Sequence, residues 1–213
     1  MITLLYKEIM LTAHPTSIVF IFLGCLVLVP AYPYSIIFMF GCLAPYLTFL
    51  NSRETNDIWY TSILPVTKDE NVLGKITLTV FFQIFQLLFS IPFVILRNFL
   101  KISNNPVGLD ATVAWYGLGL FVYAVFDFIF LTTFYKSNYK VGKAFIFAAV
   151  PMTLLMTATE SAAHIPALRW MDGFRSDHIM MQLPVLTIGI ICYMILIVSA
   201  YRISKKNFEK VPL

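Results

Sequence analysis

Long apolar runs limit what this sequence can fold into more than any other feature. Two of them, "SIIFMFGCLAPYLTFL" and "ITLTVFFQIFQLLFSIPFVIL", flank a polar stretch from Asn51 to Lys75. Each run is comparable to the about 20 residues with which a helix crosses about 30 Å of hydrocarbon. Charged residues make up 12% of the chain, about half their usual share in soluble domains. The chain is therefore predicted to be an integral membrane protein.

The apolar runs predict six membrane spans in an all-α fold. Helices are the default because an open strand in lipid leaves backbone groups unpaired. The expected spans cover residues 16–30, 34–50, 73–96, 112–135, 144–158 and 183–202 of one transmembrane domain, residues 1–213. The first and the fifth are shorter than most spans, and their length also fits a re-entrant or interfacial segment.

The distribution of Lys and Arg predicts the orientation of these spans. With six spans, eleven of the 15 basic residues fall on the side that holds both termini, the polar stretch and the 136–143 loop. Because basic residues near span ends stay on the cytoplasmic side, both termini are expected inside the cell. The positive charges are interpreted as topology markers rather than as a nucleic-acid patch.

The first residues predict a helix that lies in the membrane interface. One helical face carries an apolar stripe up to Pro15, where the pattern breaks. The stripe consists of Ile2, Leu5, Tyr6, Ile9 and Met10. An interfacial helix leading into the first span fits this pattern, and the alternative is the frayed start of a long first helix.

The polar stretch has the signature of a short helix, a stop and a new helix. Asn51 followed by Glu54 resembles a helix start, and no helix breaker follows until Pro65. Thr67 and Glu70 then match the capping pattern that begins the third span.

Apolar residues on this short helix suggest that it docks onto another protein. Ile58, Trp59 and Leu64 are expected to face water, beside Glu54 and Asp57. Tryptophan is enriched among the residues that dominate interfaces. In the alternative interpretation, Trp59 lies in the aromatic belt at the lipid headgroups.

The segment "ETNDIWYTSILPVTKDENVLGK", residues 54–75, resembles the first cytoplasmic loop of small six-span ABC exporter permeases of the type-2 exporter family. In that family a polar helix is followed by L-P-[VIL]-[ST]-[RK] and then by V-x-[GA]-K at the entry to the third span. The matching positions are Leu64, Pro65, Val66, Thr67, Lys68, Val72, Gly74 and Lys75. The order of an interfacial helix and six spans, with both ends inside, also matches.

The resemblance implies that the loop is a coupling helix seated in a groove of a separate ATPase subunit. Its contact residues are then Glu54, Asp57, Ile58, Trp59, Leu64, Pro65 and Lys68. The resemblance further implies a half-transporter in a bacterial cell membrane, in which two permease copies and two ATPase subunits form an efflux pathway. Permeases of this family that export amphipathic bacterial peptides of the phenol-soluble modulin type are similar in size. The expected cargo is therefore an amphipathic peptide or another hydrophobic molecule.

The chain itself is expected to bind no cofactor. "LGKIT" at 73–77 and "VGKAF" at 141–145 lack the first glycine of a phosphate loop and the Ser or Thr after its Lys. ATP and Mg are therefore assigned to the partner ATPase. His164 and His178 have no second ligand at metal spacing, so no metal site is expected.

Two other classes of protein compete with the exporter. An intramembrane enzyme is disfavoured because the sequence contains neither HExxH nor GxSxG. A non-transporting membrane protein, such as an immunity or sensor subunit, would keep the spans but would need neither a docking helix nor polar residues within them.

The third span does carry polar residues, and they form a stripe. Steps of four, four, three and four residues place the members on one helical face. They are Lys75, Thr79, Gln83, Gln86 and Ser90. Such a face should meet protein or water rather than lipid.

Asp127 is the only acidic residue deep in an expected span, and an intramembrane carboxylate is by default a functional hypothesis. It lies about as far from the inner membrane edge as Gln83, so the two side chains are expected to meet. With Tyr123 one turn earlier, these residues either line a cargo pathway or hold the helices together through hydrogen bonds.

The outer loop, residues 159–182, is too apolar for a plain linker. Among its charges it carries Ile165, Leu168, Trp170, Met171 and Phe174. It is expected to dip back into the outer leaflet, since related permeases carry short external or re-entrant helices at this position.

Overall fold

The computed structural model describes residues 2–57, 60–61 and 66–210, and the elements in these residues are all helical. They are α1 Ile2–Leu11, α2 Pro15–Phe22, the 3₁₀ helix η1 Leu23–Leu28, α3 Ile36–Glu54, α5 Lys68–Phe99, α6 Val113–Lys136, α7 Val141–Ala162, the 3₁₀ helix η2 Pro166–Asp172 and α8 Ser176–Glu209. The expected all-α membrane fold is confirmed.

Five of these helices, α3, α5, α6, α7 and α8, are long and apolar enough to cross a membrane. α7 has 22 residues, so the fifth span is longer than the 144–158 expected. α5 and α8, with 32 and 34 residues, reach about 50 Å at about 1.5 Å per residue. They extend past about 30 Å of hydrocarbon because polar residues continue both helices beyond their apolar parts.

The first expected span is a shorter segment, in which α2 and η1 together run from Pro15 to Leu28. A 3₁₀ helix rises about 2.0 Å per residue, so the six residues of η1 cover a greater length than six residues of α-helix, which rise about 1.5 Å each. η1 packs closely on α5 at Gly24, where a side chain would meet the Gln86 carbonyl oxygen at 3.0 Å.

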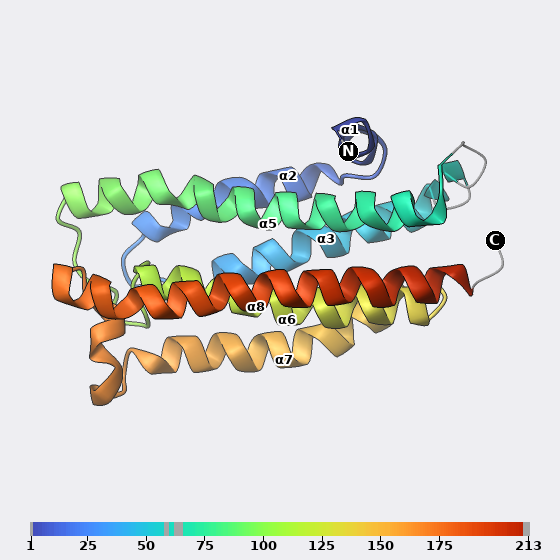
Figure 1. Cartoon of the computed structure of the whole chain (residues 1–213). Helices are drawn as coiled ribbons and strands as arrows, with labels where there is room; N and C mark the ends of the chain where they lie inside the picture. The colour runs from blue at the N-terminus through green and yellow to red at the C-terminus, as the bar shows by residue number, and fades with distance from the viewer. Residues whose placement is uncertain (1, 58–59, 62–65, 211–213) are drawn as a thin grey trace.

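The long helices lie side by side along one axis, whereas α1 is seen end-on in the same view and so lies across them (Figure 1). This direction is the one expected of a helix in the membrane interface. Tyr6 and Met10 are 61% and 65% exposed, so part of the apolar face of α1 is open to its surroundings.

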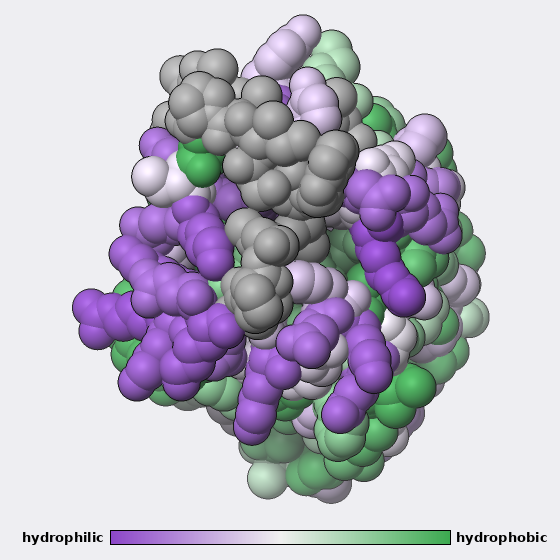
Figure 2. Space-filling model, turned by 90° about the vertical axis from the view of Figure 1, so that its right-hand side faces the viewer, coloured by the Kyte–Doolittle hydropathy of each residue, from purple (hydrophilic) through white to green (hydrophobic). Residues whose placement is uncertain are grey.

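One end of the bundle is basic. The C-terminal end of α8, the end of α3, the start of α5 and the turn from α6 to α7 all lie at this end (Figure 1). Figure 2 looks onto it and shows hydrophilic residues spread over much of this face. Its exposed cations include Arg53, Lys136, Lys140, Arg202, Lys206 and Lys210. We call it the basic end and the opposite one the outer end.

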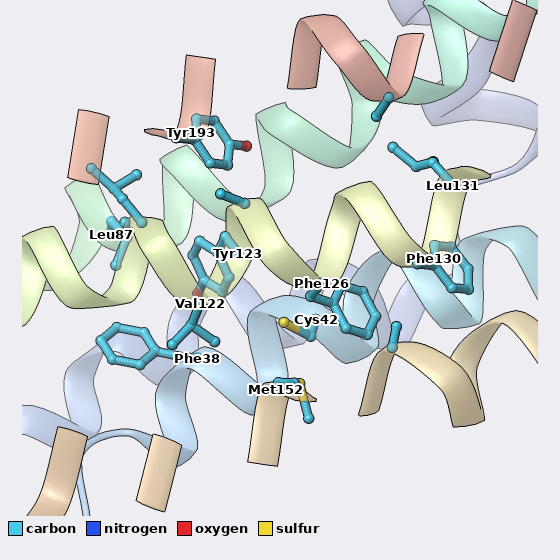
Figure 3. Packing of buried hydrophobic residues seen from close by; sticks show 14 of the residues in the cluster. Phe38, Cys42, Leu87, Val122, Tyr123, Phe126, Phe130, Leu131, Met152 and Tyr193 are labelled. Atoms are coloured by element: carbon cyan, nitrogen blue, oxygen red, sulfur yellow. The ribbon is translucent and has the colours of Figure 1, made fainter. Parts of the chain in front are cut away.

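The core is organised around α6, the span with the largest buried share. Its aromatic side chains pack against α3, where the ring centres of Phe38 and Trp115 lie 4.4 Å apart and those of Phe49 and Phe134 lie 4.8 Å apart. Figure 3 shows Phe38, Tyr123 and Phe126 within this cluster.

α6 and α8 form the most extensive helix pair, and two glycines allow their close approach. A Cβ atom on Gly189 would lie 2.2 Å from the carbonyl oxygen of Gly117, and one on Gly117 would lie 2.6 Å from that of Val185. Small residues at such crossings bring two backbones into contact, which is a common basis of helix packing in membranes.

The outer loop is shorter than the expected 159–182, because α7 continues to Ala162 and α8 begins at Ser176. η2 occupies the space between them and packs on the ends of α6, α7 and α8. The span was expected to begin only at residue 183, because the first residues of α8 include polar and charged ones such as Asp177 and do not extend the apolar run. The re-entrant placement of the loop stays a prediction.

Candidate functional site

The start of the polar loop differs from its expected form. Asn51 does not begin a helix: it lies inside α3, and its side chain donates a hydrogen bond to the Thr12 carbonyl at 3.1 Å. α3 ends at Glu54, and the chain turns at Asn56, whose φ of 52° is left-handed. Asn tolerates this conformation better than most residues. The NxxE pattern was therefore misinterpreted, since it also fits the last turns of a span.

The end of the loop has the expected form. Thr67 accepts a hydrogen bond from the Glu70 backbone N–H at 3.2 Å, and the Glu70 carboxylate accepts one from the Thr67 N–H at 2.8 Å. This capping box begins α5 at Lys68, as predicted.

Apart from Asp57, the expected ATPase contacts fall into three groups. Glu54 is exposed. Lys68 is half-buried, with its ammonium 5.5 Å from the centre of the Phe208 ring. Ile58, Trp59, Leu64 and Pro65 lie outside the described residues.

The prediction that Asp57 faces water is wrong, since the residue is only 4% exposed. Its carboxylate lies 2.7 Å from the Lys75 ammonium and accepts a hydrogen bond from the Ser52 hydroxyl at 3.1 Å. Burial alone would raise the pKa of Asp57, but Lys75, with Lys7 and Ser52, brings it below its usual value. Asp57 is therefore ionised at neutral pH, and the stability from this pairing is lost only as the pH falls through that lowered pKa.

Glu8, on α1, belongs to the same cluster and was missed by the sequence analysis. Its carboxylate lies 2.9 Å from the Lys7 ammonium and 3.4 Å from that of Lys75, and it is fully buried. Thr12 donates a further hydrogen bond to it at 2.9 Å. The available signal was the position of Glu8 within an otherwise apolar helix, where an acid needs a partner.

The polar stripe on α5 is fully buried, as expected of a face that avoids lipid: Lys75, Thr79, Gln83, Gln86 and Ser90 are at most 3% exposed. The amide of Gln86 donates to the Phe20 carbonyl at 2.8 Å and accepts from the Tyr123 hydroxyl at 2.6 Å. Ser90 and Tyr116 share a hydrogen bond of 2.7 Å. The stripe therefore ties α2 and α6 to α5.

Gln83 and Asp127 meet, as their depths predicted. The Gln83 amide donates to the Asp127 carboxyl at 2.8 Å and accepts from the Tyr193 hydroxyl on α8 at 2.9 Å. Asp127 is fully buried, and its second oxygen has no hydrogen-bond partner in the described part of the chain. In this conformation the cluster links α5, α6 and α8, which is the geometry of interhelical hydrogen bonding rather than of an open pathway.

A second buried network closes the outer end. The Arg97 guanidinium pairs with Asp110 at 2.5 Å, and the Asp110 backbone N–H donates to Asp172 at 2.7 Å. Glu160 accepts hydrogen bonds from the backbone N–H groups of Ser35 at 2.7 Å and Leu109 at 3.2 Å. From the sequence, Arg97 was expected only as a topology marker, because its partner Asp110 lies in a loop without a recognisable pattern.

Burial raises the pKa of Asp172 to about 6, and burial also raises the pKa of Asp110. A carboxyl whose pKa is higher in the folded state contributes stability below its unfolded pKa, and this contribution is lost as the pH rises through the folded value. We therefore expect the unfolding temperature of the purified protein to fall between about pH 4 and pH 6.

Asp172→Asn should reduce this fall, because an amide can still accept the Asp110 N–H and does not titrate. The raised pKa of Asp172 corresponds to at most about 3 kcal/mol of unfolding free energy. The actual contribution is expected to be smaller, because the side chain is partly exposed to solvent. Thermal unfolding of both proteins from pH 4 to pH 7.5 measures it. An unchanged slope in Asp172→Asn would contradict the role of this carboxyl.

An apolar groove of about 260 Å³ opens between α5, α6 and α8. It is lined by Ile84, Leu87, Leu88, Ile91, Val113, Tyr116, Leu120 and Leu186. Its one polar atom, the Tyr116 hydroxyl, is already bonded to Ser90, so the groove lacks free polar groups to orient a ligand.

The family model described as ABC-2 family transporter protein matches residues 3–209, and the chain belongs to this family. It is therefore a multi-pass membrane protein of the permease type found in ABC transporters, as the loop resemblance indicated. No curated protein and no solved structure matched the chain.

Proposed function

We propose that this chain is the membrane subunit of an ATP-driven exporter that works with a separate ATPase subunit. The observation that carries the proposal is the position of the described ends of the polar loop: the end of α3 and the start of α5 lie at the basic end, where the Lys68 ammonium is 5.5 Å from the centre of the Phe208 ring of α8, in a chain of the ABC-2 family. Basic ends face the cytoplasm, where ATP is available. ATP and Mg bind to the partner, and both termini of this chain lie inside a bacterial cell.

The described part of the loop supports docking at its exposed residues. Glu54 and Asn56 are open to solvent, and Tyr60 is 51% exposed. Tyrosine is enriched among residues that dominate interfaces, and the exposed acid Glu54 favours a basic partner surface. The proposed docking residues of the loop are therefore Glu54, Asn56 and Tyr60, without the buried Asp57, together with the expected contacts Trp59 and Pro65.

The efflux pathway is proposed to run between two permease copies. The polar side chains within a single copy are bonded to one another, and its core is filled by aromatic residues. Two copies with two ATPase subunits supply a pathway at their shared face. Amphipathic peptides are the proposed cargo, because they present an apolar face to the membrane and a polar face to the pathway.

Co-purification with a co-expressed ABC ATPase, sought first in the neighbouring reading frames, tests the docking surface and the stoichiometry. Tyr60→Ala and Glu54→Lys are each expected to reduce the recovered ATPase, with Tyr60→Ala weakening binding by about 2 kcal/mol, hence more than about tenfold. Native mass measurement should give two permeases and two ATPases.

Asn104→Lys is the matched control, since Asn104 is also exposed but lies at the outer end. It should retain the full amount of ATPase. Equal recovery with all three variants would place the docking surface elsewhere, and failure of the wild type to bind any ABC ATPase would refute the proposed function.

A further inference from the structure

A buried charged network joins the polar loop to two helices at the basic end. It contains two cations, Lys7 and Lys75, and two anions, Glu8 and Asp57, so its formal charges cancel. Glu8, Asp57 and Lys75 are 0%, 4% and 3% exposed. Buried charges of this kind are tolerated only where they pair with one another.

The loop is held in this network from two sides. Asp57 lies 2.7 Å from the Lys75 ammonium of α5 and 3.6 Å from the Lys7 ammonium of α1. One turn later, Thr61 accepts a hydrogen bond from Lys7 at 2.8 Å and donates one to Asp57 at 3.2 Å. The start of the loop is thus bound to α1 and α5 at once.

α1 and α5 are also in direct contact. A Cβ atom on Gly74 would lie 3.4 Å from the Glu8 side chain, so Glu8 rests on the backbone of α5 beside Lys75. Ser52, near the end of α3, accepts a hydrogen bond from Lys75 at 2.7 Å. Lys75 is therefore the point where α1, α3, α5 and the loop meet.

Pulling the loop away from α5 would leave Lys75 without one of its two anions in a buried site. Its remaining neighbours are the Glu8 carboxylate at 3.4 Å, the Ser52 hydroxyl at 2.7 Å and the Phe49 ring, whose centre lies 5.7 Å from the ammonium. None of them replaces the Asp57 carboxylate at 2.7 Å. Removing one partner of a buried pair is far less favourable than keeping the pair together. The favoured movement is one in which the loop, α1 and the start of α5 move together.

We propose that Lys7, Glu8, Asp57 and Lys75 form a transmission joint, which makes α1 and α5 follow the loop when the ATPase moves it. This inference rests on the proposed function, because it assumes that an ATPase binds the loop. The four residues are positioning residues: they contact neither ATP nor cargo. Their role is distinct from docking, which the exposed side of the loop performs.

Distances between spin labels test the joint directly. Cysteines at Thr55, at the start of the loop, and Leu88, on α5, are both exposed and accept labels in a chain whose Cys25, Cys42 and Cys192 are alanine. In the complex with the ATPase, we expect the same distance distribution without nucleotide and with trapped ATP. With Asp57→Asn, which removes one charge but keeps the shape, the distribution should shift or broaden when ATP binds.

Lys205→Met is the matched control, because it breaks another Lys–Asp pair at the same end of the bundle. In this pair the side chains of Lys205 and Asp69 are each 39% exposed. Its distance distribution should behave as in the wild type. A wild-type distribution that shifts with ATP, or an Asp57→Asn distribution that does not, would overturn the joint.

Coupling efficiency gives a second readout in proteoliposomes, with a labelled amphipathic helical peptide as the probe. Asp57→Asn is expected to keep ATPase binding and hydrolysis but to transport about tenfold less peptide per ATP, within the usual range of coupling between sites. Asp57→Lys combined with Lys75→Asp restores opposite charges and should recover part of the loss. Thr61→Val, which changes no charge, should cause a smaller loss of peptide transport per ATP. It replaces Asp57→Asn as the test variant if Asp57→Asn does not fold.

These outcomes separate the inference from the function on which it rests. Wild-type peptide transport per ATP in Asp57→Asn and Thr61→Val would refute the joint and leave the exporter intact. Loss of ATPase binding in Asp57→Asn would make Asp57 a docking residue and would also refute the joint. A wild-type complex that transports nothing would refute the proposed function, and the inference with it.

Discussion

Gly189→Ala is expected to destabilise the protein by about 3 kcal/mol or more, because the added Cβ meets backbone rather than a flexible side chain. That atom would lie 2.2 Å from the Gly117 carbonyl oxygen and 2.9 Å from the Gly117 Cα. α6 and α8 must then separate along the most extensive helix contact in the described chain. Unfolding temperature and the yield of monodisperse protein in detergent measure the effect.

Gly142→Ala is the control for this substitution. A Cβ atom on Gly142 has no neighbour within 4 Å, and the residue is exposed near the start of α7. Alanine there should change stability by less than about 1 kcal/mol, and in the favourable direction, since it has the higher helix propensity. If both alanine variants unfold like the wild type, the packing of α6 on α8 is not as close as described.

Gln83→Leu is expected to cost about 2–4 kcal/mol, because it leaves two buried groups without partners. Asp127 would lose its only hydrogen-bond donor in the described residues, and the Tyr193 hydroxyl would lose its acceptor. Phe85→Leu, an apolar change at an exposed position of the same helix, should leave stability within about 0.5 kcal/mol of the wild type.

The double variant Gln83→Leu with Asp127→Leu identifies the cause. Replacing both partners of a hydrogen bond by apolar groups is often nearly neutral, so the double variant should be more stable than Gln83→Leu alone. Asp127→Asn should retain both stability and export, because an amide oxygen accepts the Gln83 N–H as the carboxyl does. If Asp127→Asn is produced at normal levels but exports less cargo, the Asp127 carboxylate takes part in cargo recognition.

Local patterns and helical period predicted much of this architecture. Thr67 and Glu70 cap α5 because a capping box involves only adjacent turns. The stripe from Lys75 to Ser90 faces inward because one helical period fixes its direction, and Gln83 met Asp127 because their depths agreed. Such features depend on residues close in sequence or on a shared membrane depth.

Features that depend on distant partners were not predictable in this way. Glu8 and Lys75 lie 67 positions apart, and no periodicity relates α1 to α5. The same limit applies to Gly117 and Gly189, since a glycine in an apolar run does not indicate which helix it touches. Asp57 resembled a surface acid because its polar neighbours in sequence are exposed, although its own partners lie on other helices.

Peptide uptake by proteoliposomes that contain the chain and its ABC ATPase tests most directly the claim that this protein is an export permease. The measurement follows a labelled amphipathic helical peptide into vesicles whose ATPase subunits face outward. Uptake is predicted to require ATP and both subunits, and to stop when the phosphate-loop lysine of the ATPase is replaced. Equal peptide accumulation with and without ATP, from a complex that hydrolyses ATP normally, would contradict the claim.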